Sequence, residues 1–208
     1  MMQGLDDYLL LYVMVFVYLQ LKFPPQHFDI QHPIRHCWQN GGGEYMRNLY
    51  KNKWFSVVEM ADRIWVAEPG NPAVAILTWG SHLLFVRIDR RLHGLSMELP
   101  RGGSEGDESA IETAARELLE ETGYRVQPEH ARVIGHLVPN SGRDASKVSV
   151  VEFDFSTCNA EFTGKTDGEC LGCYWINRYE IQSMIRDGLI TCGITLSALN
   201  VWLSKTAH

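Results

Sequence analysis

The sequence predicts an α/β domain of three layers, in which helices cover both faces of a sheet. Two observations indicate this class. Short apolar segments with the spacing of covered strands recur along residues 54–176, and predicted helices lie between and after them. The chain has 208 residues and 45% hydrophobic content, so it can bury one sizeable core. We therefore expect one domain with an extension.

The predicted strands are short and bounded by turn residues. Apolar residues at alternating or continuous spacing predict a hairpin of Ala73–Trp79 and His82–Ile88, which turns at Gly80-Ser81. The other expected strands are Trp54–Glu59, Arg63–Glu68, Arg132–Val138, Val148–Phe155 and Leu171–Ile176.

Two capping boxes predict where helices begin. In Ser109-Ala-Ile-Glu112 the serine and glutamate side chains can satisfy free backbone amides, so a helix should start near Ala110, and Gly123 should end it in the left-handed conformation. Asn177-Arg-Tyr-Glu180 predicts a second helix that stops at Gly188. A last helix is expected from about Ile194 to Ser204.

The first 45 residues differ from the rest of the chain. The apolar run Tyr8–Leu19 is too short to span a bilayer, and the acidic residues before it are unlike a secretory signal. We favour a buried element or an oligomer contact over membrane association. Pro24-Pro25 should end this element, and Gly41–Gly43 should form a flexible joint. We therefore predict an extension at 1–45 and a catalytic domain at 46–208.

The first predicted helix carries three carboxylates on one side. At about 100° per residue, Glu117, Glu120 and Glu121 share an arc of roughly 100°. Three such carboxylates repel one another unless a cation lies between them, and Mg²⁺ prefers oxygen ligands of this kind. The alternative is a solvated acidic helix face.

The spacing around these carboxylates adds a family resemblance. Gly102, Glu108, Arg116-Glu117-Leu-Leu-Glu120-Glu121 and Gly123 fall at the intervals of the Nudix hydrolase signature box, which this segment resembles. The resemblance implies a Nudix-type α/β/α sandwich with a mixed β-sheet. It also implies Mg²⁺ dependence, with Mn²⁺ as a substitute, and hydrolysis of a nucleoside diphosphate linked to another group.

The same resemblance suggests a role for each residue of the box. Glu117, Glu120 and Glu121 would hold the metal together with the backbone carbonyl of Arg101, and Glu117 and Glu121 would be catalytic. The remaining positions would be structural. Gly102 and Gly123 would bound the motif, and Arg116 and Glu108 would form an ion pair that fixes the loop to the helix.

Residues outside the box resemble the ADP-ribose and ADP-sugar pyrophosphatase branch. Glu98-Leu-Pro-Arg-Gly-Gly is similar to the entry motif of that branch, and Pro139 resembles its downstream proline. Both Glu98 and Pro139 are therefore expected to bind substrate. Arg101 departs from the more usual alanine, and its guanidinium would either clamp a phosphate or remain in solvent.

A later acidic segment supplies a candidate general base. Thr166-Asp-Gly-Glu169 is similar to the loop that delivers the catalytic glutamate in ADP-ribose pyrophosphatases, which makes Glu169 the candidate. The alternative is a loop carboxylate without a chemical role.

Composition limits the partners. A net charge of −6 argues against nucleic-acid binding, which needs a basic surface. Small phosphorylated substrates remain compatible, because a bound metal would neutralise the acidic site locally, and the resemblance implies a small nucleotide as the partner. Five cysteines, an odd number, favour free thiols in a reducing cytoplasm. The segment Trp54–Glu68 is similar to the strands that such enzymes exchange in a homodimer.

Three functions remain open at this point. The first is hydrolysis of ADP-ribose or a nucleotide sugar to a nucleoside monophosphate and a sugar phosphate. The second is hydrolysis of dinucleoside polyphosphates or of damaged nucleotides with the same box. The third is a Nudix-fold sensor that binds a nucleotide without turnover.

Overall fold

The computed structural model describes residues 47–60 and 63–206. The apolar run Tyr8–Leu19, Pro24-Pro25 and Gly41–Gly43 lie outside the described residues. Within the described part, no helix is both long and apolar enough to cross a membrane.

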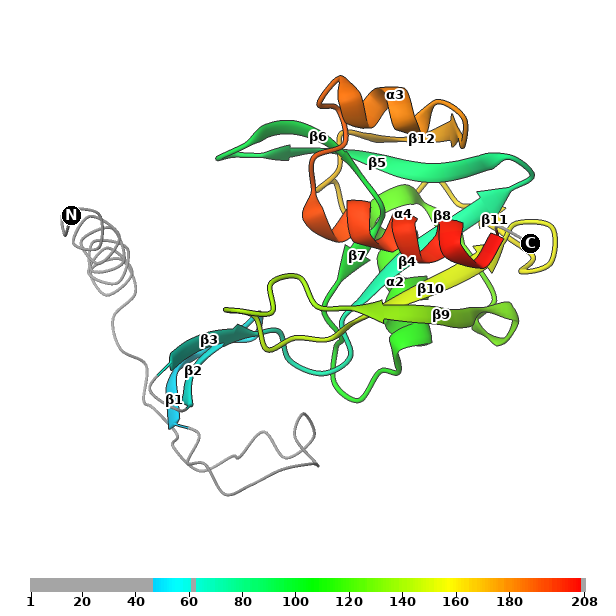
Figure 1. Cartoon of the computed structure of the whole chain (residues 1–208). Coiled ribbons are helices and arrows are strands. Elements are labelled where there is room, and N and C mark those ends of the chain that lie inside the picture. The colour runs from blue at the N-terminus through cyan, green and yellow to red at the C-terminus, as the bar shows by residue number, and fades with distance from the viewer. Residues whose placement is uncertain (1–46, 61–62, 207–208) are drawn as a thin grey trace. The chain divides into compact units, whose positions relative to one another are not determined.

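The centre of the domain is a mixed β-sheet (Figure 1). Its main path runs β12-β5-β4-β10-β9, with β6 paired to β5 and β7 to β4. Strands β4 and β10 are parallel, and the other neighbours are antiparallel. The strands are β4 (Ala73–Trp79), β5 (His82–Arg90), β6 (Gly94–Glu98), β7 (Arg101–Gly102), β9 (Arg132–Leu137), β10 (Val148–Asp154) and β12 (Gly172–Asn177). The predicted mixed sheet is confirmed.

The predicted β4–β5 hairpin is paired only next to its turn, at Thr78 with Leu83 and Trp79 with His82. Beyond these pairs each strand takes a new partner, because β6 pairs with the end of β5 and β7 with the start of β4. The chain between β6 and β7 therefore crosses from one strand to the other. There, the carbonyl of Pro100 accepts a hydrogen bond from the amide of Ala75 at 2.8 Å.

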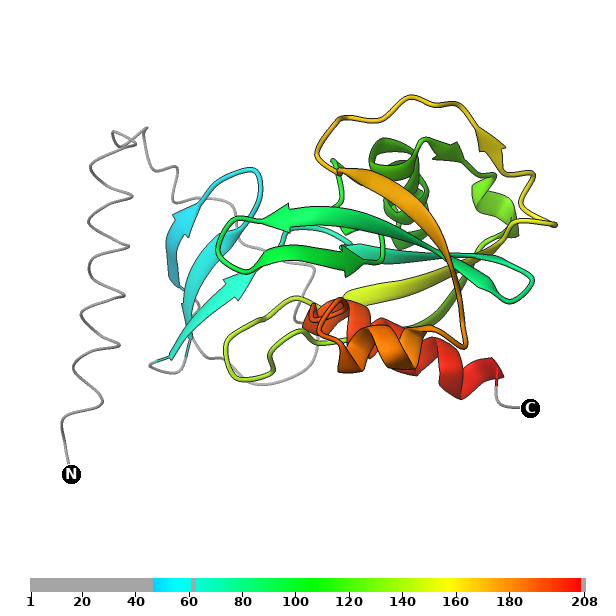
Figure 2. The ribbon, with the colours of Figure 1, turned by 90° about the horizontal axis from the view of Figure 1, so that it is seen from above.

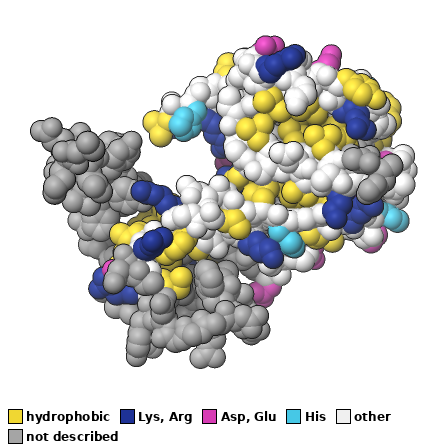
Figure 3. Space-filling model, in the orientation of Figure 1, with side chains coloured by type: hydrophobic (Ala, Val, Ile, Leu, Met, Phe, Trp, Pro, Cys, Tyr) yellow, Lys and Arg dark blue, Asp and Glu magenta, His cyan; other side chains and the backbone are white. Residues whose placement is uncertain are grey.

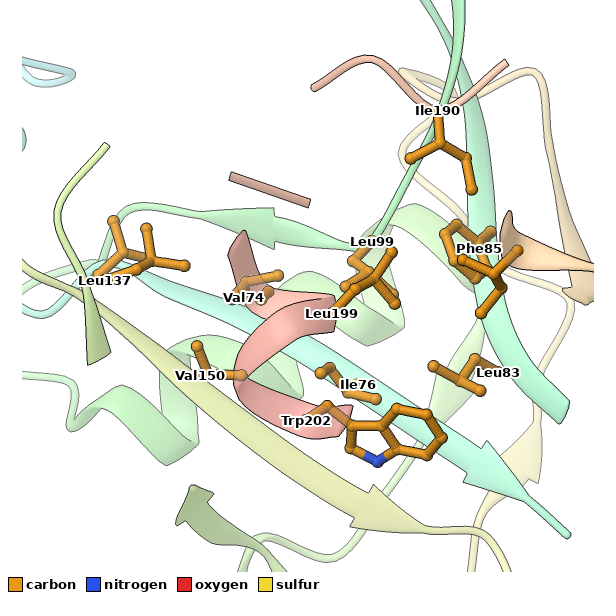
Figure 4. Close-up of a cluster of buried hydrophobic side chains, with 13 residues drawn as sticks. Val74, Ile76, Leu83, Phe85, Leu99, Leu137, Val150, Ile190, Leu199 and Trp202 are labelled. Atoms are coloured by element: carbon orange, nitrogen blue, oxygen red, sulfur yellow. The ribbon is translucent and has the colours of Figure 1, made fainter. Parts of the chain in front are cut away.

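Helices cover both faces of the sheet, as predicted (Figures 1 and 2). Alternation along β4 sends Ala73, Ala75 and Leu77 toward α2 (Ala110–Thr122), where they pack with its buried apolar side chains. Val74 and Ile76 point to the opposite face and pack with Leu199 and Trp202 of α4 (Gly193–Thr206) (Figure 4). The short helix α3 (Ile181–Arg186) contributes to the same face.

A second antiparallel sheet precedes the main one and consists of β1 (Arg47–Lys51), β2 (Ser56–Met60) and β3 (Arg63–Ala67). Strand β1 was not predicted. The strand expected from Trp54 begins at Ser56, because the side chain of Asn52 accepts hydrogen bonds from the amides of Trp54 and Phe55 and holds them in a turn. Two shorter strands, β8 (Tyr124–Arg125) and β11 (Glu161–Phe162), also pair, and a 3₁₀ turn η1 spans Pro128–His130.

One of the two predicted capping boxes forms. Ser109 and Glu112 satisfy each other's amides at the start of α2, and Gly123 ends the helix at φ 77°. The box expected at Asn177–Glu180 was wrong. Asn177 ends β12, its side chain accepts from the amide of Tyr179, and Glu180 precedes α3 without a side-chain cap. The residues form a turn because strand pairing with β5 extends through Asn177.

Candidate functional site

Helix α2 buries one of the three predicted carboxylate ligands, that of Glu121, and leaves the other two half-buried. Thr113, Ala114 and Leu118 are buried against the sheet, whereas Glu117 and Glu120 lie toward the edge of that contact. On the face seen in Figure 3, which α3 and α4 cover, acidic side chains are sparse and Lys and Arg are more prominent. The acidic cluster lies on α2, which packs against the face of the sheet opposite to α3 and α4.

Glu121 is the most deeply buried of the three carboxylates, with 8% of the residue exposed. Its Oε2 atom accepts a hydrogen bond from the backbone amide of Arg101 at 3.3 Å. Burial, together with the charge of nearby Glu117, raises the pKa of Glu121 to about 8. A carboxylate in this position needs positive charge beside it to be ionised at neutral pH.

Glu117 lies directly against the strand that carries the box glycine. A Cβ atom built on Gly102 would be 2.0 Å from Oε1 of Glu117, so no other residue fits at position 102 without moving the carboxylate. Burial also raises the pKa of Glu117, an effect that its hydrogen bond with Arg116 opposes. The short strand β7 therefore touches two of the predicted metal ligands, through the glycine and through the amide of Arg101.

Arg116 connects the loop before α2 to the acidic face. Its guanidinium donates to both oxygens of Glu108 at 3.0–3.2 Å and to the carbonyl of Gly103 at 2.6 Å. The expected ion pair between Arg116 and Glu108 is thus present. Its Nη1 atom also bridges Oε1 of Glu117 and Oε2 of Glu120, each at 2.8 Å. Burial disfavours the charge of Arg116, but the bonds to Glu108 and Glu117 outweigh it, and the pKa is raised.

The three carboxylates share one helix face but do not converge on a single point. Among residues 47–60 and 63–206, no three His, Cys, Asp or Glu side chains are placed to hold a metal ion. Glu117 and Glu120 turn toward Arg116, and Glu121 turns toward the amide of Arg101. The donor set nevertheless fits a hard divalent cation, because it consists of carboxylate oxygens. The pKa values of Glu117 and Glu121 are raised, so a positive charge beside them would favour their ionised forms. Such a cation would compete with Arg116 for Glu117 and Glu120.

The acidic loop after β11 is attached to the end of α2. The amide of Asp167 donates to the carbonyl of Glu120 at 2.9 Å, and Thr163 bonds to the carbonyl of Gly123. The charge of Asp167 contributes to the raised pKa of Glu121, after the larger effects of burial and of Glu117. The predicted base, Glu169, is exposed, and its amide donates to Oδ1 of Asp167. Asp167 is therefore the loop carboxylate whose charge acts on Glu117 and Glu121, and it was not among the predicted site residues.

Glu98 occupies a different position from the one expected of a substrate ligand. It is 2% exposed, and its two oxygens accept from Nε and Nη2 of Arg90 at 3.1 and 2.7 Å. Burial opposes the ionised form, but the bonds from Arg90 outweigh it and the pKa of Glu98 is lowered. The half-exposed guanidinium of Arg90 is the group that this pair presents outward. Arg90 was not predicted as a site residue. The feature of the sequence that could have indicated it is a basic residue at the end of a covered strand, and its partner Glu98 lies on the neighbouring strand β6.

Arg101 and Pro139 belong to the side of the domain near β3. Nη1 of Arg101 lies 3.5 Å from Oε1 of Glu68, so its guanidinium is partly held there. Pro139 is half-buried at the start of a segment that joins β3, through hydrogen bonds of Val66 with Arg143 and Ala145. Arg101 contacts the carboxylates of α2 through its backbone amide, which bonds to Glu121. The segment that begins at Pro139 contacts β3 instead.

A further polar region of the described domain shares no residue with the carboxylate cluster of α2. A cavity of about 330 Å³ is lined by His130, Arg132, Glu152, Asp154 and Thr157. Within it, Glu152 already accepts from Arg132 and from the indole of Trp202, which joins α4 to the sheet. Cys158, Cys170, Cys173 and Cys192 are free thiols.

Comparison with known domains places the chain in a family. A model described as the NUDIX domain matches residues 69–188, more than half of the chain, and the chain belongs to this family. It is a Nudix pyrophosphohydrolase, and its family generally uses a divalent metal such as Mg²⁺.

Known relatives agree with this membership. The chain is 30% identical over 110 residues to Phosphatase NudJ of Escherichia coli K12 and of Shigella flexneri, which covers 51% of this chain and 69% of each relative. It is also similar to a crystal structure of an ADP compounds hydrolase, with a TM-score of 0.56 and 16% identity over 78% of this chain and 93% of the other. At this identity the structural likeness shows the fold.

Proposed function

We propose that the protein catalyses the Mg²⁺-dependent hydrolysis of the pyrophosphate bond of a nucleoside diphosphate derivative, most directly ADP-ribose or a nucleotide sugar. The observation that supports this best is the contact of β7 with the acidic face of α2. Gly102 lies against Glu117, and the amide of Arg101 bonds to Glu121. A backbone strand that approaches one buried and one half-buried carboxylate so closely is suited to a site for a cation and a phosphate.

Glu117, Glu120 and Glu121 would hold the metal, with the carbonyl of Arg101 as a further ligand. When bound, the metal supplies Lewis acidity to the phosphate oxygens and to a water molecule. Mn²⁺ has the same preference for oxygen ligands and would be a substitute. Arg116 would keep Glu117 and Glu120 on the same side of the helix, because it contacts both.

The acidic loop would accept a proton from the attacking water. Glu169 is our candidate for the general base, since its exposed side chain follows Asp167 in the loop attached to α2. The oxygen of water forms a bond to phosphorus while the bond to the bridging oxygen breaks. The products are a nucleoside monophosphate and a sugar phosphate, and the proton passes to the base.

Arginines near the cluster would hold the phosphates. Arg101 extends from β7, and its guanidinium can clamp phosphate oxygens in a bidentate manner. Glu98 would act on substrate through Arg90, which it holds by two hydrogen bonds. Pro139 would shape the segment that joins β3 and would contribute to substrate binding from there.

The substrate class is supported by the resemblance of Glu98-Leu-Pro-Arg-Gly-Gly to the ADP-ribose branch, and the fold is that of an ADP compounds hydrolase. The name of the relatives, phosphatase, does not specify this substrate class, and the second candidate is hydrolysis of dinucleoside polyphosphates or of damaged nucleotides. Incubation with Mg²⁺ and ADP-ribose, nucleotide sugars, dinucleoside polyphosphates or nucleoside triphosphates, followed by product identification, separates the two. Preferred release of AMP from ADP-ribose supports the first, and preferred turnover of dinucleoside polyphosphates or triphosphates supports the second.

We further propose that residues 46–208 form the catalytic unit and that the protein acts as a cytoplasmic homodimer. A chain that begins at Glu44 should retain turnover with unchanged kcat. Sedimentation of the full chain should give twice the mass of one chain, which is 23.7 kDa. Loss of turnover in the folded shorter chain would contradict the proposed boundary.

A further inference from the structure

Glu68 follows β3 and lies beside the arginine of β7. Its Oε1 atom is 3.5 Å from Nη1 of Arg101, and both side chains are largely buried, with 28% and 23% exposed. This distance is long for a hydrogen bond, so the pair is weaker than the bidentate pair of Arg90 with Glu98. The guanidinium of Arg101 therefore has donors left for a ligand.

The position of Glu68 is fixed by its backbone. Its amide donates to Oγ of Ser146 at 2.7 Å. The chain that follows it is attached to the loop before α2, because Oγ of Ser104 accepts from the amide of Asn71 at 2.8 Å. Two segments distant in sequence thus hold the backbone around Glu68, whose carboxylate lies beside Arg101.

The second oxygen of Glu68 has no partner. Oε2 is buried and receives no hydrogen bond. Buried carboxylate oxygens without a donor are rare in folded proteins, since the lost hydration is not replaced. Rotation of the carboxylate about its last torsion, which has a broad minimum, would present this oxygen to a donor at the partly exposed side.

We propose that Glu68 is a specificity-determining residue, which selects ligands that place a hydroxyl group, and not a further phosphate, next to the phosphate held by Arg101. A hydroxyl can donate to the unpartnered oxygen, whereas an additional phosphate has no proton to donate and is repelled by the carboxylate. The inference rests on the proposed function and deepens it. The negative charge of Glu68, beside the guanidinium of Arg101, would favour a diphosphate joined to a sugar over a polyphosphate.

Steady-state kinetics of the full-length protein test this directly. The substitutions Glu68→Gln and Glu68→Asp are compared with wild type on ADP-ribose and on ATP. We expect Glu68→Gln to raise the ratio of kcat/KM for ATP to that for ADP-ribose by about tenfold, because a repulsive charge is removed. Glu68→Asp should restore most of the wild-type ratio. Glu129→Gln, which removes one exposed charge from η1, should leave the ratio unchanged.

A ratio unchanged in a folded Glu68→Gln protein, or an equal fall for both substrates, would overturn the proposal. A second measurement does not depend on turnover. Calorimetry in EDTA compares inorganic pyrophosphate with tripolyphosphate, and Glu68→Gln should tighten tripolyphosphate binding more than pyrophosphate binding. If wild type hydrolyses no diphosphate derivative but this difference is seen, the proposed function fails and the role of Glu68 stands. If hydrolysis proceeds without the difference, only the role of Glu68 fails.

Discussion

Gly102 and Glu117 are in direct contact, and a Cβ atom on the glycine would lie 2.0 Å from Oε1 of the glutamate. The contact joins the strand before the helix to the acidic face of the helix. Because the helix places Glu121 one turn after Glu117, the same strand also reaches Glu121, through the amide of Arg101. The geometry of the cluster therefore depends on the absence of a side chain at position 102.

The substitution Gly102→Ala should displace the carboxylate of Glu117. We expect the Mg²⁺ concentration for half-maximal activity to rise about tenfold, as is typical when the support of a metal ligand is altered. A Mg²⁺ titration of turnover measures this. Gly103→Ala is the matched control, because a Cβ there meets no atom within 4 Å. Equal Mg²⁺ dependence in the two variants would argue against the contact.

The substitution Arg116→Leu should destabilise the domain by about 2–4 kcal/mol, since it leaves Glu108 and Glu117 without their cation in a partly buried position. Urea unfolding followed by circular dichroism measures the loss. Arg47→Ala removes an ion pair whose arginine is 71% exposed, and it should cost less than about 1 kcal/mol. A similar small loss in both variants would show that the ion pairs of Arg116 contribute little to the stability of the domain.

The stability of the metal-free protein should fall as the pH rises from about 4.5 to 8. Glu121 has a pKa of about 8 in the folded protein and an ordinary value of 4.5 when unfolded. Between these values the folded state binds more protons than the unfolded state, so the free energy of unfolding decreases with pH. Urea unfolding in EDTA across this range measures the slope, and Glu121→Gln should reduce it. A wild-type slope in the variant would mean that Glu121 is not the group responsible.

The two acidic residues of the loop should differ in their effects. If Glu169 is the base, Glu169→Gln should lower kcat at least tenfold and leave the Mg²⁺ dependence of turnover unchanged. Asp167→Asn should instead alter the Mg²⁺ dependence, because the charge of Asp167 acts on Glu117 and Glu121. The outcome that contradicts our choice of base is a normal kcat in Glu169→Gln with a large loss in Asp167→Asn.

Local sequence was sufficient to predict α2 and most strands of the main sheet. The capping box of Ser109 and the left-handed Gly123 depend only on neighbouring residues, and both are present. The box at Asn177 failed because pairing of β12 with β5 retains Asn177 in the strand. Tertiary pairing here overrides a signal that is correct elsewhere in the chain.

The candidate site was predictable where its residues share one helix or lie in the segment just before it. Glu117, Glu120 and Glu121 follow from periodicity, whereas Arg90, Asp167 and Glu68 reach the candidate site through strand pairing and contacts between segments. Arg90 meets Glu98 across β5 and β6, and Asp167 is attached to the end of α2 by its backbone. Glu68 meets Arg101 because β3 joins a loop of the main domain. No local pattern contains these contacts.

The most direct test of the central claim is the Mg²⁺ dependence of ADP-ribose hydrolysis in wild type and in Glu121→Gln. The variant keeps the size of the side chain and an oxygen that can accept from the amide of Arg101, so it should remain folded. We predict that AMP is released by wild type only with a divalent cation and that the folded variant loses at least about 99% of this activity. Wild-type turnover in the variant, or turnover by wild type in EDTA, would contradict the proposed metal site.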